Sequence, residues 1–242
     1  MKEDSVTRRL QAQLEVALRD RDEYKTRALR AEARLRDDLW KSRTDHLDRF
    51  FCHTARDRLV NLFPNAKEVT ESVGAFHAVN QHLMVDRGDP NVTAIVVGDG
   101  HSPRTGALIA LSTNWNVWSV DPVLKTKYRG ISERLTLIDA KIEDSPGWNL
   151  PGKRVVIVAV HSHARLQDAV RKVRACARLD AVSIPCCVKQ HVMYLDPEGD
   201  DTVVPVPPDV TYEDGAILSP ERTVLVWKNI ETKIRAIALG IP

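Results

Sequence analysis

A chain of 242 residues is long enough for one sizeable hydrophobic core and an appendage, which predicts one or two domains. Its 35 lysine and arginine residues nearly balance 33 aspartate and glutamate residues, so net charge does not indicate a polyanion binder and any basic surface must be local. No apolar run reaches the roughly 18 residues of a membrane span, the first residues are charged, and the four cysteines lack disulfide spacing, which predicts an intracellular, cytoplasmic or nuclear protein in a reducing compartment.

Residues 1–47 are predicted to form one long helix. From residue 6 onward this segment contains neither glycine nor proline and is rich in arginine, alanine and leucine. Two sets of residues recur every seven positions: Leu10, Ala17, Tyr24 and Ala31, and Leu14, Arg21, Ala28 and Leu35. This imperfect heptad pattern leaves three interpretations open, namely a solvated helix packed on its own domain, a coiled coil that makes a homo-oligomer, and an arginine-rich arm that holds RNA.

Residues 48–90 are predicted to be a helical segment that covers the sheet edge and the mouth of a pocket. A short amphipathic helix ends at Pro64, and the pattern of Val73 to Val85 indicates a second. Pro90 and Asn91 then mark a boundary by their turn chemistry.

Residues 91–242 are predicted to form an α/β domain, because apolar runs rich in β-branched residues alternate with helical patterns. Such alternation is typical of a mainly parallel, Rossmann-like sheet buried on both faces. The predicted strands are Thr93 to Val97, Asn116 to Val120, Leu135 to Ile138, Val155 to Val160 and Ala181 to Ile184, and the predicted helices are Arg104 to Ser112 and Arg165 to Ala177. Three later strand-like runs predict a C-terminal antiparallel hairpin: Val192 to Leu195, Thr223 to Trp227 and Lys233 to Ala238.

The strongest local signal is the run from Ala94 to Gly106, AIVVGDGHSPRTG, in which a buried strand enters a glycine turn that opens a helix. Glycines let the backbone approach a ligand, and a helix N-terminus presents free N–H groups. An ordinary tight turn is the alternative. The candidate cofactor-binding residues of this turn are Gly98, Asp99, Gly100, Ser102 and Pro103.

Two aspartates end the next two predicted strands. Asp121 follows the glycine turn by about twenty residues, the spacing at which a carboxylate meets ribose hydroxyls in such folds. Its alternative role is that of a turn former before Pro122. Asp139 ends the third predicted strand and is a candidate to lie near an adenine, or to be structural only.

The order of these elements over about residues 91–242 resembles the class I S-adenosylmethionine-dependent methyltransferases. The hairpin favours this family, because its members are known for a seven-stranded sheet with an antiparallel last strand, which nicotinamide-binding Rossmann domains lack. The resemblance implies S-adenosylmethionine as the cofactor. The chain departs from the family motif at Val96, where an acidic residue is usual. Asp99, between the glycines, is the candidate to engage the methionine amino group instead.

A finer similarity lies in the run VHSHA at residues 160–164, followed by IPCC at residues 184–187. This pair is similar to the Leu-His-x-Cys-Gly and Pro-Cys-Cys motifs of a methyltransferase-like group that includes glutathione S-transferase C-terminal-domain-containing proteins. His161 matches the motif, whereas His163 stands at its cysteine and Ala164 at its glycine.

His161 and His163 are the predicted catalytic residues, because an imidazole at the pocket rim can act as a general base. Together with Cys186 and Cys187 they also have the chemistry of zinc ligands. Adjacent residues on a strand point to opposite faces, however, so both cysteines cannot easily reach one metal. Pocket lining or substrate contact is favoured, and plain packing is the alternative.

Two functions follow from the sequence. The first is a methyltransferase that acts on a macromolecular acceptor, with RNA, including a cap structure, favoured by analogy. The second is a catalytically inactive methyltransferase-like scaffold, or an RNA-binding assembly protein, that oligomerises through its N-terminal helix. Val96 in place of the acidic residue favours the second function.

Overall fold

The computed structural model describes Leu29 and residues 44–186, 193–195 and 204–238. The chain divides into two compact units, Met1–Thr44 and Asp45–Pro242. Most of the helix predicted for residues 1–47, including its heptad pattern, lies outside the described residues, while residues 44–51 are helical. None of the helices in the described ranges is both long and apolar enough to cross a membrane.

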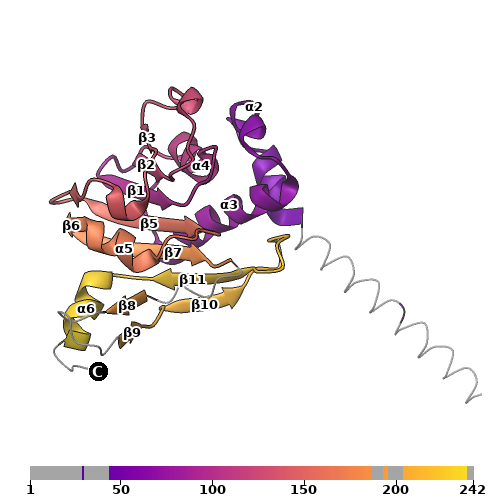
Figure 1. Ribbon diagram of the computed structural model, residues 1–242. Coiled ribbons are helices and arrows are strands. Elements are labelled where there is room, and N and C mark those ends of the chain that lie inside the picture. The colour runs from indigo at the N-terminus through magenta and orange to yellow at the C-terminus, as the bar shows by residue number, and fades with distance from the viewer. Residues whose placement is uncertain (1–28, 30–43, 187–192, 196–203, 239–242) are drawn as a thin grey trace, which may run out of the picture. The chain divides into compact units, whose positions relative to one another are not determined.

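The second unit is built on a seven-stranded sheet with the order β10-β11-β7-β5-β1-β2-β3 (Figure 1). Strand β11 runs antiparallel to both of its neighbours, whereas β3, β2, β1, β5 and β7 are mutually parallel. The mainly parallel α/β sheet with a C-terminal antiparallel hairpin is therefore confirmed. Its strands are β1 (Val92–Val97), β2 (Asn116–Val120), β3 (Leu135–Ile138), β5 (Arg154–Val160), β7 (Arg178–Ile184), β10 (Val210–Glu213) and β11 (Thr223–Trp227).

Helices and two small sheets complete this unit. Helix α3 starts after Pro64, where the Asn65 side chain accepts a hydrogen bond from the Glu68 backbone N–H at 3.0 Å. The helical elements are α2 (Arg56–Leu59), η1 (Val60–Leu62), α3 (Ala66–Ala78), η2 (Val79–Leu83), α4 (Arg104–Ser112), η3 (Thr126–Tyr128), η4 (Ile142–Asp144), α5 (Leu166–Lys172) and α6 (Ile230–Ala238). Strand β4 (Trp148–Asn149) pairs with β6 (Val173–Ala175), and β8 (Met193–Leu195) pairs with β9 (Val204–Val206).

Three predictions about the later elements were wrong in part. The run from Lys233 to Ala238 belongs to helix α6, because Ile230 and Ile234 are four residues apart and pack on the same core. The helix predicted to reach Ala177 ends at Lys172, and the residues that follow form β6. The hairpin partner of β11 is β10, whereas β8 lies in a separate small sheet.

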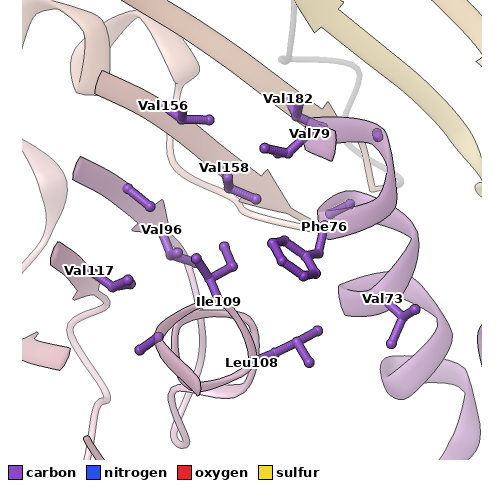
Figure 2. Close-up of a cluster of buried hydrophobic side chains, with 14 of the residues drawn as sticks. Val73, Phe76, Val79, Val96, Leu108, Ile109, Val117, Val156, Val158 and Val182 are labelled. Atoms are coloured by element: carbon purple, nitrogen blue, oxygen red, sulfur yellow. The ribbon is translucent and has the colours of Figure 1, made fainter. Parts of the chain in front are cut away.

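The sheet is buried on both faces, as its continuous apolar strands predict. Ala94 and Val96 of β1 face one hydrophobic core, whereas Ile95 and Val97 face the other. Helices α3 and α4 cover the first face, and α5 and α6 cover the second. Figure 2 shows residues of α3, η2 and α4 against strand valines in the first core: Val73, Phe76, Val79, Leu108 and Ile109 against Val96, Val117, Val156, Val158 and Val182.

Candidate functional site

The glycine turn between β1 and α4 lies at the carboxyl end of the sheet. Gly98 and Gly100 have φ angles of +73° and +77°, a left-handed conformation that glycine adopts without steric cost. The Gly98 N–H donates to the backbone carbonyl of Val120 at 2.9 Å, which ties the turn to the end of β2. The backbone of the turn is therefore fixed to the sheet on one side, and on the other side Gly98 and Gly100 line a cavity.

Asp99 is buried beneath this turn. Its Oδ1 accepts a hydrogen bond from the Thr105 N–H at 2.9 Å, and its Oδ2 accepts from the Gly106 N–H at 2.9 Å and from Ser119 Oγ at 2.8 Å. These contacts place a carboxylate at the N-terminus of α4, where the helix dipole favours it. Burial raises the pKa of Asp99 to about 6, although the three hydrogen bonds act to lower it. Asp99 therefore has a structural role at the N-terminus of α4, and its predicted contact to a methionine amino group would compete with these three donors.

Asp121 follows β2 and is half-buried. Its Oδ2 accepts from the Gly100 N–H at 2.9 Å, and its Oδ1 accepts from the Val123 N–H at 2.9 Å. A carboxylate has about four acceptor positions, so two remain for hydroxyl groups of a ligand. A hydrogen bond thus links the glycine turn to Asp121, the aspartate that the sequence spacing predicted to lie beside it.

A cavity of about 590 Å³ opens beside these residues. Its wall consists of the glycine turn, the end of β2 with Asp121, residues 140–143 after β3, and His161, His163 and Ala164 after β5. Each segment follows the carboxyl end of a parallel strand, which is where open α/β sheets bind ligands. The volume lies within the range of about 300–1,000 Å³ that is usual for small-molecule sites.

Five of the predicted site residues line this cavity: Gly98, Gly100, Asp121, His161 and His163. Four others lie outside its wall, among them the buried Asp99 described above. Ser102 is buried and donates its hydroxyl to the backbone carbonyl of Leu62 at 2.8 Å, and Pro103 precedes the first residue of α4. Asp139 is exposed, while the next residues, from Ala140 onward, contribute to the wall.

A smaller polar cavity of about 120 Å³ adjoins the larger one, because Gly98, Arg104 and His161 line both. Helix α3 supplies a lysine and two glutamates to the smaller cavity, and one of them, Glu68, forms an ion pair with Arg104. Sequence reasoning missed these residues of α3, because they belong to a buried cover helix and carry no motif spacing. Arg104 stands within the glycine motif and could have been found there.

Glu71 and His161 meet in the smaller cavity, with Oε1 and Nε2 3.2 Å apart. The exposed fractions of their side chains are 5% and 20%. Burial raises the pKa of Glu71, against the opposing effects of Lys67 and of a hydrogen bond from Ser219. Burial and the positive charge of Lys67 lower the pKa of His161. The raised pKa favours the protonated, neutral carboxyl group of Glu71, and the lowered pKa favours the unprotonated, neutral imidazole of His161.

The four side chains with the chemistry of zinc ligands are those of His161, His163, Cys186 and Cys187. Cys186 is partly buried, His163 is exposed, and Cys187 lies outside the described residues. Over the described ranges of the chain, no group of three or more His, Cys, Asp or Glu side chains is placed to hold a metal ion. His161 and His163 are instead located at the cavity wall.

No protein-family model matches the sequence, and no curated protein matches it. Solved structures with a similar fold include S-adenosylmethionine-dependent methyltransferases. Geranyl diphosphate methyltransferase in complex with S-adenosylmethionine is 15% identical, with 50% of this chain and 55% of that chain covered and a TM-score of 0.33. Coclaurine N-methyltransferase bound to S-adenosylhomocysteine is 15% identical, with 57% and 42% covered and a TM-score of 0.35.

A third structure, a mutant of MtNAS in complex with S-adenosylmethionine, is 14% identical, with 78% of this chain and 72% of that chain covered and a TM-score of 0.47. The chain thus spans about half the length of the two methyltransferases and more of MtNAS. The TM-scores of all three lie below 0.5, and these similarities say nothing of what the chain binds or does.

Proposed function

We propose that the larger cavity binds S-adenosylmethionine and that the protein is a methyltransferase. The observation that carries the proposal is the Asp121 carboxylate, which is hydrogen-bonded to Gly100 and retains two acceptor positions at the cavity wall. The strand order and the antiparallel β11 support it, because they agree with the seven-stranded sheet of the family that the sequence resembles.

The cavity wall suggests how the cofactor lies. Asp121 is placed to accept hydrogen bonds from the ribose hydroxyls, and Val123 and Ile142 offer apolar surface to the adenine. The methionine end then points toward Gly98 and His161, where the two cavities meet. A bound S-adenosylmethionine supplies an activated methyl group, and the protein contributes mainly the alignment of the acceptor with it.

A second candidate, a methyltransferase-like scaffold without catalysis, is favoured by one feature. The usual acidic residue is replaced by Val96, which is buried in the core, and the nearby Asp99 is engaged by α4. RNA as the acceptor, assembly through residues 1–47 and kinship with the glutathione S-transferase C-terminal-domain-containing group remain predictions of the sequence.

Calorimetric titration of the purified chain with S-adenosylmethionine and S-adenosylhomocysteine tests the proposal. We expect both ligands to bind, and Asp121→Asn to weaken binding by about tenfold or more, because hydrogen bonds to a charged group contribute roughly 1.5–3 kcal/mol. Asp139→Asn is the matched control, since this aspartate ends the next strand but lies outside the cavity wall. The absence of binding by either ligand to the wild-type chain would refute the proposed function. Binding without transfer of labelled methyl groups to RNA, protein or small molecules would favour the scaffold.

A further inference from the structure

The contact between Glu71 and His161 places two nearly buried polar atoms against each other. Oε1 and Nε2 lie 3.2 Å apart, but neither makes an aligned hydrogen bond with another described residue. Lys67 Nζ is the other charged atom near Oε1, at 3.4 Å. A carboxylate oxygen and an unprotonated imidazole nitrogen are both acceptors and repel each other at this distance, so the geometry favours a proton between Oε1 and Nε2.

The backbone of His161 supports a functional reading of this contact. His161 has a φ of +47°, a left-handed conformation that is uncommon for residues other than glycine. Its N–H donates to the backbone carbonyl of Ile184 at 2.8 Å, which fixes the conformation at the end of β5. Strained backbone of this kind concentrates at sites of function. Here it holds the imidazole against Glu71 at the junction of the two cavities.

We propose that Glu71 and His161 together hold one proton-binding site, which takes up the proton of the methyl acceptor, an amine or hydroxyl group that enters the smaller cavity. This inference rests on the proposed S-adenosylmethionine site. In the transfer, a bond forms between the acceptor nitrogen or oxygen and the methyl carbon, and the carbon–sulfur bond breaks. Its electron pair stays on sulfur, and the acceptor proton passes to the pair.

The chemistry of the smaller cavity agrees with such an acceptor. Its volume of about 120 Å³ suits a single functional group, and polar and charged side chains dominate its wall. A general base must lie within hydrogen-bond reach of the proton that it removes. Glu71 and His161 both line this cavity, and His161 also lines the cavity proposed for the cofactor.

The charges around the pair come from several elements. Lys67 of α3 lowers the pKa of both partners, and Glu221, which precedes β11, raises the pKa of His161. Arg104 of α4 is paired with Glu68 at the same cavity. The sulfonium of S-adenosylmethionine would add one positive charge here, whereas S-adenosylhomocysteine is neutral at sulfur. A unit charge about 5 Å away lowers a neighbouring pKa by roughly two at an effective dielectric constant of about 20.

Proton release on cofactor binding therefore tests the pair without knowledge of the acceptor. The two ligands are titrated by calorimetry between pH 5.5 and 7.0 in buffers of different ionisation enthalpy, which gives the number of protons released. We expect S-adenosylmethionine to release more protons than S-adenosylhomocysteine, with a difference of up to about one. Asp99 lines the same cavity as the pair and has a pKa of about 6, so the comparison is made in the Asp99→Asn background. There the difference should disappear in Glu71→Gln and in His161→Asn, because each variant removes one half of the pair.

Asparagine is chosen at position 161 because it tolerates the left-handed conformation. Glu133→Gln, on the exposed surface, is the control that should keep the wild-type difference. If Glu71→Gln does not fold, which thermal unfolding would show, His161→Asn alone decides. Equal proton release by the two ligands, or a difference that survives in His161→Asn, would overturn the pair but leave the cofactor site intact. Failure of both ligands to bind would instead overturn the proposed function, and the pair with it.

Discussion

Ser162 occupies the space that a side chain at Gly98 would need. A Cβ atom at Gly98 would lie 2.3 Å from Ser162 Oγ and 2.9 Å from Ser162 Cα, and the second of these is backbone that cannot rotate away. Ser162 itself is fully buried, and its Oγ accepts a hydrogen bond from the Ala164 N–H at 3.1 Å. The glycine turn and the residues after β5 therefore pack closely against each other at the junction of the two cavities.

Gly98→Ala should therefore move the turn and lower the affinity for S-adenosylmethionine more than tenfold. Left-handed strain and the clash with Ser162 should together reduce the free energy of unfolding by about 2–4 kcal/mol. Gly152→Ala is the matched control, because Gly152 has the same φ of +73° but no atom within 4 Å of an added Cβ. Denaturant unfolding and calorimetry measure the two effects. Equal losses in both variants would show that the contact with Ser162 is unimportant.

Asp99 should make the free energy of unfolding fall as the pH rises, which is the opposite of the usual effect of an aspartate. Its pKa is raised from the ordinary 3.8 to about 6, so the unfolded chain loses this proton at a lower pH than the folded chain does. The contribution of Asp99 is thus fully present below about pH 4 and is lost as pH rises through 6. A difference of about two in pKa corresponds to roughly 3 kcal/mol.

Asp99→Asn cannot titrate and provides the comparison. The free energy of unfolding of the wild type, minus that of the variant, should fall by about 3 kcal/mol between pH 4 and pH 7. Urea unfolding at the two pH values measures this difference. If the difference were the same at both pH values, burial would not control the ionisation of Asp99.

His46 and Asp214 link the helix of residues 44–51 to the turn after β10, with Nε2 and Oδ2 2.8 Å apart. Burial acts to raise the pKa of Asp214, but the hydrogen bond and charge of His46 lower it overall. A carboxylate whose pKa is lowered in the folded state stabilises the fold at pH values above its ordinary pKa. This stabilisation is lost as the pH falls through the lowered pKa. Asp214→Asn should therefore reduce the free energy of unfolding by about 1–3 kcal/mol at pH 6, and by less at pH 3.

The exposed Asp57, which pairs with Arg56, offers a control for the loss of an aspartate charge. Asp57→Asn should change stability by less than about 1 kcal/mol, because surface ion pairs contribute little. Chemical unfolding at pH 6 compares the two variants, and similar effects would contradict a specific role for the contact with His46.

Asp180 is a buried carboxylate between Arg154 and Arg178, at distances of 2.7 and 3.0 Å. It also accepts a hydrogen bond from the Asn229 N–H at 2.8 Å. Asp180→Asn should reduce the free energy of unfolding by about 1–3 kcal/mol, because it weakens the hydrogen bonds of a buried carboxylate while the partly exposed arginines keep contact with water. The residue lies near the start of β7, away from the carboxyl ends of the strands, so ligand affinity of the folded protein should not change. A selective loss of affinity would contradict this separation of stability from binding.

The sheet strands and α4 were predictable because their residues carry local signals. Asn116–Val120, Leu135–Ile138 and Thr223–Trp227 agree with the structure at both ends, since each is a short apolar run between turn residues. Helix α6 was not, because its isoleucines are β-branched and resemble a strand, while their spacing of four residues places them on one helical face.

The candidate site was predictable only where it follows a strand. Gly98, Gly100 and Asp121 are separated by a spacing that the βαβ unit imposes, and they line one cavity. Glu71 is different, because it comes from a cover helix and reaches His161 only through tertiary packing of α3 on the sheet. Ser102 faces Leu62 for the same reason, although its place in the motif suggested a ligand contact.

The most direct test of the account is the crystal structure of the protein with bound S-adenosylhomocysteine. We expect the ligand in the cavity beside the glycine turn, with its ribose hydroxyls within hydrogen-bond distance of Asp121 and its sulfur facing His161. Adenosine density at another place in the fold, or a ribose that does not contact Asp121, would contradict the proposed cofactor site.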